Sequence, residues 1–292
     1  MICRLCPRSC GAERTGTVGK GYCRMPEVPV LAQAALHHWE EPPISGMQGS
    51  GTLFFSGCSL DCVFCQNEKI SHQDFGRAVT LPRLREICET LIRQGAHNLN
   101  FVNPTHYVHI LAELLEEWHP PVPVVFNTGG YDNTDTLQRL EGKVNIYLPD
   151  LKHLDRETAR RYSAAPDYPE IAQAAIREMV RQTGSCRFDD NGLLLKGTII
   201  RHLILPGQVN QAKAVMDWVA REFGPGTVLF SLMSQYTPWG NLSAVPELNR
   251  RLRPGEIRAA REYMENLGLP GFTQERTSAK EEYTPPFDLT GI

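Results

Sequence analysis

Three cysteines within eight residues form the group in this sequence that is best suited to chemistry. Cys58, Cys62 and Cys65 follow a C-x3-C-x2-C spacing, with an aromatic residue, Phe64, directly before the last of them. A short loop of this kind can wrap three thiolates around an iron–sulfur cluster, which four thiolates normally hold. One iron would then stay open to a small molecule, so the spacing indicates cluster chemistry rather than storage of electrons. The alternative is three incidental cysteines of a buried core.

A second set of cysteines lies within the first 23 residues. Cys3, Cys6, Cys10 and Cys23 offer four thiolates in a segment rich in Gly, Pro and Arg. Four ligands would close a site completely, which suits structural zinc or a second iron–sulfur cluster. Both need soft thiolates, and the sequence does not decide between them. The alternative is a reduced tail that binds no metal.

Strand-like and helix-like segments alternate from residue 50 onward, and they must position the first cysteine loop. Short apolar segments bounded by Gly, Pro, Asn or Asp are predicted as buried parallel strands. They are 53–56, 98–102, 123–126, 144–148, 198–205 and 227–232. Helices are predicted after them, over 84–92, 108–118, 132–140, 169–182, 210–223 and 256–267. Six consecutive βα units require a parallel sheet, either open or curled into a barrel.

Polar residues lie at the carboxyl ends of these strands, where sites gather in such sheets. The cysteine loop directly follows the first strand. In strand order, the further candidates are Asn103, Thr105, Asn127, Asp150, Lys152 and His202. The structural alternatives are a helix cap for Thr105, a turn at Asn127, a simple salt bridge between Asp150 and Lys152, and a satisfied core position for His202.

The run from Ser50 to Asn67 resembles the cluster loop of the radical S-adenosylmethionine (SAM) superfamily, including the branch of glycyl-radical-enzyme activating proteins. The N-terminal Cys-x2-Cys-Pro-x2-Cys-Gly pattern and the segment 41–46 resemble a PflX-like group related to pyruvate formate-lyase activating enzyme. This similarity runs over nearly the whole chain. It implies an α/β fold, a partial (β/α)6 TIM-type barrel with the cluster at its mouth and a small cysteine-rich N-terminal appendage.

The resemblance also implies cofactors and roles. Cys58, Cys62 and Cys65 would hold a [4Fe–4S] cluster whose open iron chelates SAM, and a reductant such as flavodoxin or ferredoxin would drive cleavage to methionine and a 5′-deoxyadenosyl radical. The residues expected to bind the cofactor are Phe64, Asn103, Thr105, Asn127, Asp150, Lys152 and His202. Asp150 would accept a ribose hydroxyl, and Lys152 would meet the carboxylate of SAM. The chain departs from the family where Asn103-Pro104-Thr105-His106 replaces a Gly-Gly-Glu-type segment.

Three functions follow as expectations. The first is a radical SAM oxidoreductase that abstracts hydrogen from a partner, with a glycyl-radical enzyme as the partner that the related group indicates. The second is a radical SAM enzyme that modifies a peptide or small metabolite. The third is a non-catalytic iron–sulfur or zinc protein in electron transfer or assembly. Release of 5′-deoxyadenosine from SAM would separate the third from the other two.

Composition narrows the setting. The 292 residues carry a net charge of −3 with mixed signs throughout, so no nucleic-acid or membrane partner is indicated. No apolar run approaches the roughly 20 residues that span a bilayer. The chain has nine cysteines, an odd number, and most of them are clustered. Together with the lack of a secretory signal, this favours reduced thiols in a cytoplasm. The expected organisation is an appendage over 1–49, a barrel over 50–269 and an irregularly packed tail over 270–292.

Overall fold

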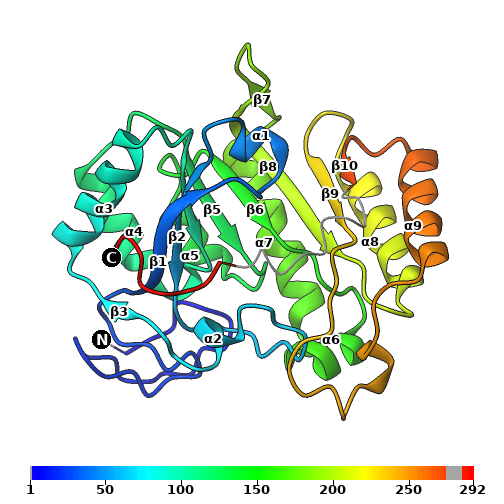
Figure 1. Cartoon of the computed structure of the whole chain (residues 1–292), viewed down its shortest axis with the longest axis horizontal. Coiled ribbons are helices and arrows are strands. Elements are labelled where there is room, and N and C mark those ends of the chain that lie inside the picture. The colour runs from blue at the N-terminus through cyan, green and yellow to red at the C-terminus, as the bar shows by residue number, and fades with distance from the viewer. Residues whose placement is uncertain (1, 274–284) are drawn as a thin grey trace.

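The computed structural model describes residues 2–273 and 285–292. A single sheet crosses the molecule in the order β10-β9-β8-β6-β5-β4-β2-β1-β3 (Figure 1). Its parallel strands are β2 (Ser50–Phe55), β4 (Leu99–Val102), β5 (Val124–Thr128), β6 (Ile146–Pro149), β8 (Leu194–Leu203), β9 (Leu229–Met233) and β10 (Gly271–Thr273). In the described part of the chain the sheet stays open between β10 and β3 (Arg77–Ala78), so the predicted partial barrel is confirmed.

All six predicted strands are present, as β2, β4, β5, β6, β8 and β9, and they pair in chain order. Four further strands join them, one of which is β10, parallel to β9 at the edge of the sheet. β1 (Val30–His37) pairs antiparallel with β2 and with β3, and β7 (Arg187–Phe188) forms a small antiparallel pair with β8. β1 lies inside the segment that the sequence assigned to the appendage. The division at residue 49 therefore stays a prediction, while the sheet itself begins earlier.

Helices lie outside the sheet and at its two ends (Figure 1). They are α1 (Pro42–Ser45), α2 (Glu68–Ser71), α3 (Leu81–Arg93), α4 (Val108–Glu117), α5 (Thr134–Gln138), α6 (Arg156–Ser163), α7 (Tyr168–Thr183), α8 (Val209–Glu222) and α9 (Pro254–Leu267), with short 3-10 turns at Thr105–Tyr107 and Pro246–Leu248. α3 shows why they form where they do. The Thr80 hydroxyl accepts the N–H of Arg83 at its start, one apolar face is buried, and Gly95, with φ 97°, follows its end.

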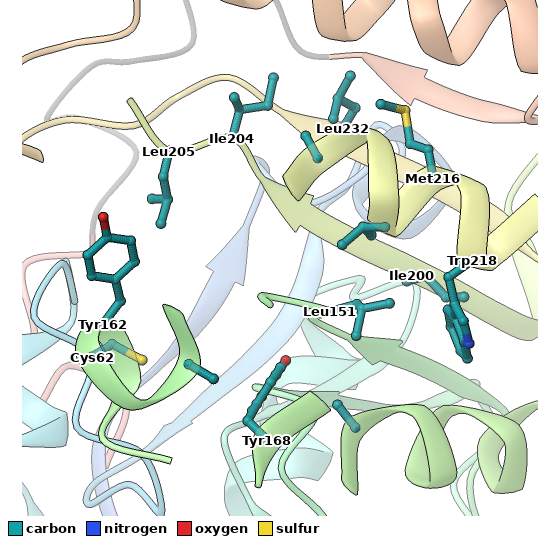
Figure 2. Packing of buried hydrophobic residues seen from close by; sticks show 14 of the residues in the cluster. Cys62, Leu151, Tyr162, Tyr168, Ile200, Ile204, Leu205, Met216, Trp218 and Leu232 are labelled. Atoms are coloured by element: carbon teal, nitrogen blue, oxygen red, sulfur yellow. The ribbon is translucent and has the colours of Figure 1, made fainter. Parts of the chain in front are cut away.

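A large apolar cluster anchors the cysteine loop to the second half of the barrel. Leu60 and Cys62 belong to it, together with residues of β8, β9, α6, α7, α8 and α9. Figure 2 shows Cys62 beside Tyr162 of α6, with Leu151 and Tyr168 further along the same interior. Burial of this kind stabilises by about 25 cal/mol per Å² of apolar surface removed from water. The loop is therefore part of the core rather than an exposed excursion.

The two ends of the barrel differ. Figure 1 shows α1 and β7 at the upper end, and α2, α6 and the dark-blue N-terminal residues at the lower end. At the upper end Ile44 of α1 is fully buried against strand residues that include Val125, Ile146 and Leu148. Asn98 fixes α1 by donating to the Ile44 carbonyl at 2.7 Å. The site is therefore reached from the lower end, where the parallel strands finish.

The C-terminal residues 285–292 pack along β1, which the red segment crosses in Figure 1. The Ala34 N–H donates to Thr290 at 2.9 Å, and the Leu289 N–H donates to Ala32 at 3.0 Å. Phe287 is buried edge-on against Phe54, with ring centroids 5.3 Å apart. The predicted tail thus includes β10 and this docked segment, while its residues 274–284 lie outside the described part. Within 2–273 and 285–292, no helix combines the length and apolar character needed to cross a bilayer.

Candidate functional site

Backbone geometry turns the chain sharply from β2 into the cysteine loop. Gly57 has φ 80°, and a Cβ at this position would overlap the Met25 side chain and lie 2.8 Å from the Cys23 carbonyl oxygen. Only glycine satisfies both the left-handed backbone and this close approach. Asn103, itself at φ 59°, holds the turn from the end of β4 by donating to the Gly57 carbonyl at 2.5 Å.

The three cysteines of the loop face one cavity of about 260 Å³. The Cys58 sulfur accepts the N–H of Leu60 at 3.3 Å and lies 3.7 Å from the Asn103 side-chain oxygen. The Cys62 thiol donates to Ser163 at 3.2 Å, and the Cys65 sulfur lies 3.2 Å from the Ser71 hydroxyl. All three thiols are free. The loop thus presents three sulfurs at the mouth of the barrel.

Burial controls the acidity of these thiols. It raises the pKa of Cys58 to about 12 and that of Cys62 to about 11, and neighbouring thiols act in the same direction. The Lys152 ammonium opposes this rise at both sulfurs. Thiolates would therefore form here when a metal replaces the proton, since metal ligation deprotonates a thiol outright.

Most of the residues predicted to bind the cofactor line the same cavity. They are Phe64, Asn103, Asn127, Asp150 and Lys152, and the structure adds Arg201, Met233 and Gln235. Lys152 donates to Asp150 at 2.5 Å, and Arg201 donates to the other Asp150 oxygen at 2.9 Å. Asp150 and Lys152 thus form the salt bridge that was the structural alternative, and they do so on the cavity wall. The salt bridge is observed, and the role of this pair in binding SAM stays a prediction.

Arg201 is the functional candidate that sequence reasoning missed. Its guanidinium donates to Asn127 at 2.6 Å and lies 3.4 Å from the carboxylate of Glu40, in the loop after β1. The signal was present in the sequence, as a cation inside the apolar strand that also carries His202. A charged residue is rarely buried without a partner. Its partner, Glu40, comes from the segment assigned to the appendage, so the contact could not be foreseen.

Neighbouring charges set the ionisation of the acidic and basic residues around Arg201. Burial alone would raise the pKa of Asp150, but Arg201 and Lys152 together hold it below its ordinary value. Burial raises the pKa of Glu40, and Arg201 only partly offsets that rise. Burial alone would lower the pKa of Lys152, but Asp150 and Cys62 together raise it. The cavity wall therefore carries an ionised carboxylate flanked by two cations.

Two predicted residues lie away from the cavity lining. His202 follows Arg201 in β8 and points to the opposite face, where its Nδ1 lies 2.7 Å from the Leu151 carbonyl. Thr105 is buried and donates to Asp132 at 2.6 Å, and the helix-cap alternative is not observed either, because Thr105 lies inside the 3-10 turn, where Pro104 holds the cap position. The cofactor-binding roles predicted for His202 and Thr105 gain no support from these positions.

The second cysteine set gathers in the N-terminal segment. Cys3, Cys6 and Cys23 are buried, Cys10 is exposed, and all four are free thiols. Cys6 interacts electrostatically with each of the other three. Among residues 2–273 and 285–292, no three His, Cys, Asp or Glu side chains are arranged to hold a single metal ion. The predicted choice between zinc and a cluster therefore stays open at this point.

Comparison with known proteins identifies the family. The model of the radical SAM superfamily matches residues 52–219, more than half of the chain. The chain therefore belongs to the radical SAM superfamily. An uncharacterized protein of Methanocaldococcus jannaschii is 29% identical over 278 residues, which cover 91% of this chain and 75% of that protein.

Two solved structures share the fold. SuiB of Streptococcus suis matches with a TM-score of 0.52 at 14% identity, over 80% of this chain and 50% of that one. A mutant of spore photoproduct lyase matches with a TM-score of 0.51 at 14% identity, over 75% of this chain and 74% of that one. The chain thus spans about half the length of SuiB. At such identities the likeness shows the fold alone.

The family implies SAM and a [4Fe–4S] cluster, and the residues of the cavity fit both. Three soft sulfur donors are what a cluster with one open iron requires. Beside them, the Asp150 carboxylate and Asn127 amide offer partners for hydroxyl groups, and Lys152 and Arg201 offer partners for a carboxylate. Phe64, which is 7% exposed, adds an apolar wall.

Proposed function

We propose that this member of the radical SAM superfamily is an oxidoreductase in which a bound [4Fe–4S] cluster supplies the electron that cleaves SAM to a 5′-deoxyadenosyl radical for hydrogen abstraction. The observation that carries the proposal is the single cavity shared by three free cysteines and a compensated charge network. Cys58, Cys62 and Cys65 would hold the cluster.

The remaining residues would bind and orient SAM. Lys152 is positioned by Asp150, and it would pair with the carboxylate of SAM through a charge-assisted hydrogen bond. Asp150 stays ionised at neutral pH, so it can accept a hydroxyl of the ribose while it holds both cations. Asn127 would contribute a further polar contact. Arg201 acts through its hydrogen bonds to Asp150 and Asn127, which lock both side chains in place.

Shape and burial complete this arrangement. Cys62, Phe64 and Leu60 join the loop to the apolar core, so the sulfurs are held by a rigid support. Ligands held in place on such a support keep the geometry that a reactive site needs. Ile44 closes the opposite end of the barrel. These features support a site that protects its chemistry rather than one that only stores electrons.

We further propose a protein partner, with a glycyl-radical enzyme as the class to test first. The Asp150-x-Lys152 pair resembles the pair found in activating enzymes, and it lines the cavity here. A peptide or a small metabolite would be the partner under the alternative reading. Formation of a glycyl radical, detected by electron paramagnetic resonance in a mixture with a candidate enzyme, would separate these classes.

The central test uses the full chain reconstituted anaerobically with iron and sulfide, then mixed with dithionite and SAM. We expect 5′-deoxyadenosine and methionine to form in equal amounts. Cys62→Ala should abolish product, while Cys186→Ala should retain it, because Cys186 is a half-buried thiol outside both cysteine sets. A preparation with an intact first cluster that releases no 5′-deoxyadenosine would contradict the proposal and favour a non-catalytic iron–sulfur protein.

A further inference from the structure

The N-terminal segment contains four converging cysteines that the proposed SAM chemistry does not use. Cys3, Cys6 and Cys10 come from one tight turn, in which Cys3 exchanges backbone hydrogen bonds with Ala12 and Gly11 at 2.9 and 3.1 Å. Cys23 approaches from a second turn and interacts electrostatically with Cys3 and Cys10. Three of the four side chains are buried. Four free thiols gathered in one short segment form a donor set that suits a soft metal centre.

Backbone N–H groups point at these sulfurs in a repeated way. The backbone amide two residues further along interacts with the thiol in each pair: Arg8 with Cys6, Ala12 with Cys10 and Met25 with Cys23. The same arrangement occurs in the SAM-site loop, where Leu60 donates to Cys58 and Asn67 donates to Cys65. Such bonds stabilise the thiolate form and tune metal–sulfur centres. The two loops therefore share the local geometry of metal-binding cysteines.

A buried cation accompanies the four sulfurs. Arg14 is 1% exposed, and its guanidinium lies 3.7 Å from the Cys3 sulfur. The same guanidinium donates to the carbonyl of His106 at 2.6 Å, which ties it to the barrel. A centre with four thiolates carries net negative charge, and a buried positive charge compensates it.

The spacing of the sulfurs favours a cluster over zinc. A single zinc ion draws its four ligands into one tetrahedron, whereas a cubane cluster spreads them because each thiolate binds a different iron. Across residues 2–273 and 285–292 neither cysteine set has the compact arrangement of a single-ion site. The N-terminal set thus shares with the SAM-site loop the lack of a compact single-ion arrangement.

The N-terminal segment packs directly on the SAM-site loop. Arg8 donates to the Ser59 carbonyl, between Cys58 and Leu60, at 2.8 Å. The Cys23 carbonyl and the Met25 side chain crowd the position that a Gly57 side chain would take. Residues adjacent to both cysteine sets are therefore in contact, and a rigid N-terminal turn would brace the first loop.

We propose that Cys3, Cys6, Cys10 and Cys23 hold a second iron–sulfur cluster, closed by four thiolates and packed against the loop that carries the first. Because all four positions are taken by protein, this cluster binds no small molecule. Its presence does not depend on SAM cleavage, so a failure of the proposed function would leave this inference standing.

The test is the metal content of the full chain, expressed with added iron and purified without oxygen. Iron, acid-labile sulfide and zinc are measured in four proteins. The wild type should hold about eight irons per chain, and the Cys58→Ala/Cys62→Ala/Cys65→Ala variant about four. The Cys6→Ser/Cys23→Ser variant should also hold about four, and the control Cys186→Ser should match the wild type. Circular dichroism reports whether each variant is folded.

Two results would overturn the inference. One is a folded triple-alanine variant that contains no iron, because the N-terminal set would then hold no cluster. The other is about one zinc per chain that persists in that variant and disappears in Cys6→Ser/Cys23→Ser. If the double-serine variant does not fold, the triple-alanine variant decides the question alone, since its N-terminal set is unchanged.

Discussion

At the scale of single residues, side-chain direction decides which neighbour in β8 serves the cavity. Arg201 lines it, whereas His202 faces the Leu151 carbonyl behind it. Arg201→Met removes a cation bound to Asp150 and Asn127, so we expect the KM for SAM to rise about tenfold or more, as loss of charge-assisted hydrogen bonds does. His202→Gln should change that KM less than about threefold.

The comparison needs a control for folding, because breaking a buried ion pair destabilises by roughly 3–5 kcal/mol. Arg201→Lys keeps the charge and should fall between wild type and Arg201→Met in KM. Steady-state kinetics at several SAM concentrations provide the measurement. An equal rise in KM for Arg201→Met and His202→Gln would show that the histidine, as the family resemblance implies, reaches the cofactor after all.

Asp132 gives the molecule a pH-dependent stability of unusual sign. Burial raises its pKa to about 6 from an ordinary 3.8, and the hydroxyls of Thr105 and Thr128 oppose that rise. The folded state therefore keeps the proton to higher pH than the unfolded state does. Stability from this group is full below about pH 4, falls as pH rises to about 6, and is level above that.

Asp132→Asn should remove this dependence, because the amide does not titrate. The free energy of unfolding of the wild type, relative to the variant, should fall by up to about 3 kcal/mol between pH 4 and pH 7. Urea denaturation at each pH measures the difference, and the titration of Asp150 is common to both proteins and cancels. Parallel pH curves for the two proteins would contradict the predicted protonation of Asp132.

At the scale of elements, the backbone at Gly57 is the critical turn between β2 and the cysteine loop. Gly57→Ala would place a methyl group against the Cys23 carbonyl and Met25 in a strained left-handed backbone. We expect it to lower iron retention by the first cysteine set and to destabilise the fold by more than about 1 kcal/mol. Iron content in a background that lacks the N-terminal cysteines measures the first effect.

Gly142→Ala is the matched control, since Gly142 has φ 78° but no atom within 4 Å of an added Cβ. It carries the same backbone strain of about 1 kcal/mol without the overlap, so its iron content should equal that of the wild type. If the two alanine variants lose iron equally, the packing of Met25 and Cys23 against the turn has no part in shaping the loop.

The elements predicted from the sequence each show one of two signals. The first is a continuous apolar run, and the second is a repeat of apolar residues at helical spacing. β4, β5, β6, β8 and β9 are of the first kind, and α3 is of the second. β1 was missed because its segment Val30–His37 holds three alanines, which favour helix, and only its pairing with β2 makes it a strand. α6 was missed because its sequence is mostly polar.

The candidate site divides in the same way. Its cysteine spacing is local, and the alternation that put Asp150 and Lys152 on one side of the chain is local as well; both residues line the cavity. The choice of His202 over Arg201 depended on resemblance, and the link from Arg201 to Glu40 joins residues that are 161 positions apart. Contacts between residues so far apart in the chain follow from the tertiary fold of the sheet, and they leave no pattern in the sequence.

At the scale of the whole molecule, residues from both ends of the chain support the site. The N-terminal turn packs on the cysteine loop through Arg8, and Lys69 of α2 donates to the Phe287 carbonyl of the C-terminal segment at 2.6 Å. β1 pairs with β2, and so it supports the strand that leads into the cysteine loop. The sequence prediction of a separate appendage and tail gave no sign of this cooperation.

The plug formed by Ile44 has a consequence for traffic through the barrel. Because this end is blocked, every ligand must bind and dissociate through the single entrance beside the cysteines. The molecule that goes deepest has to arrive first and leave last. Under the proposed function, the order of binding and release would therefore be fixed. A large substrate still bound at the entrance would block the release of the products of SAM cleavage.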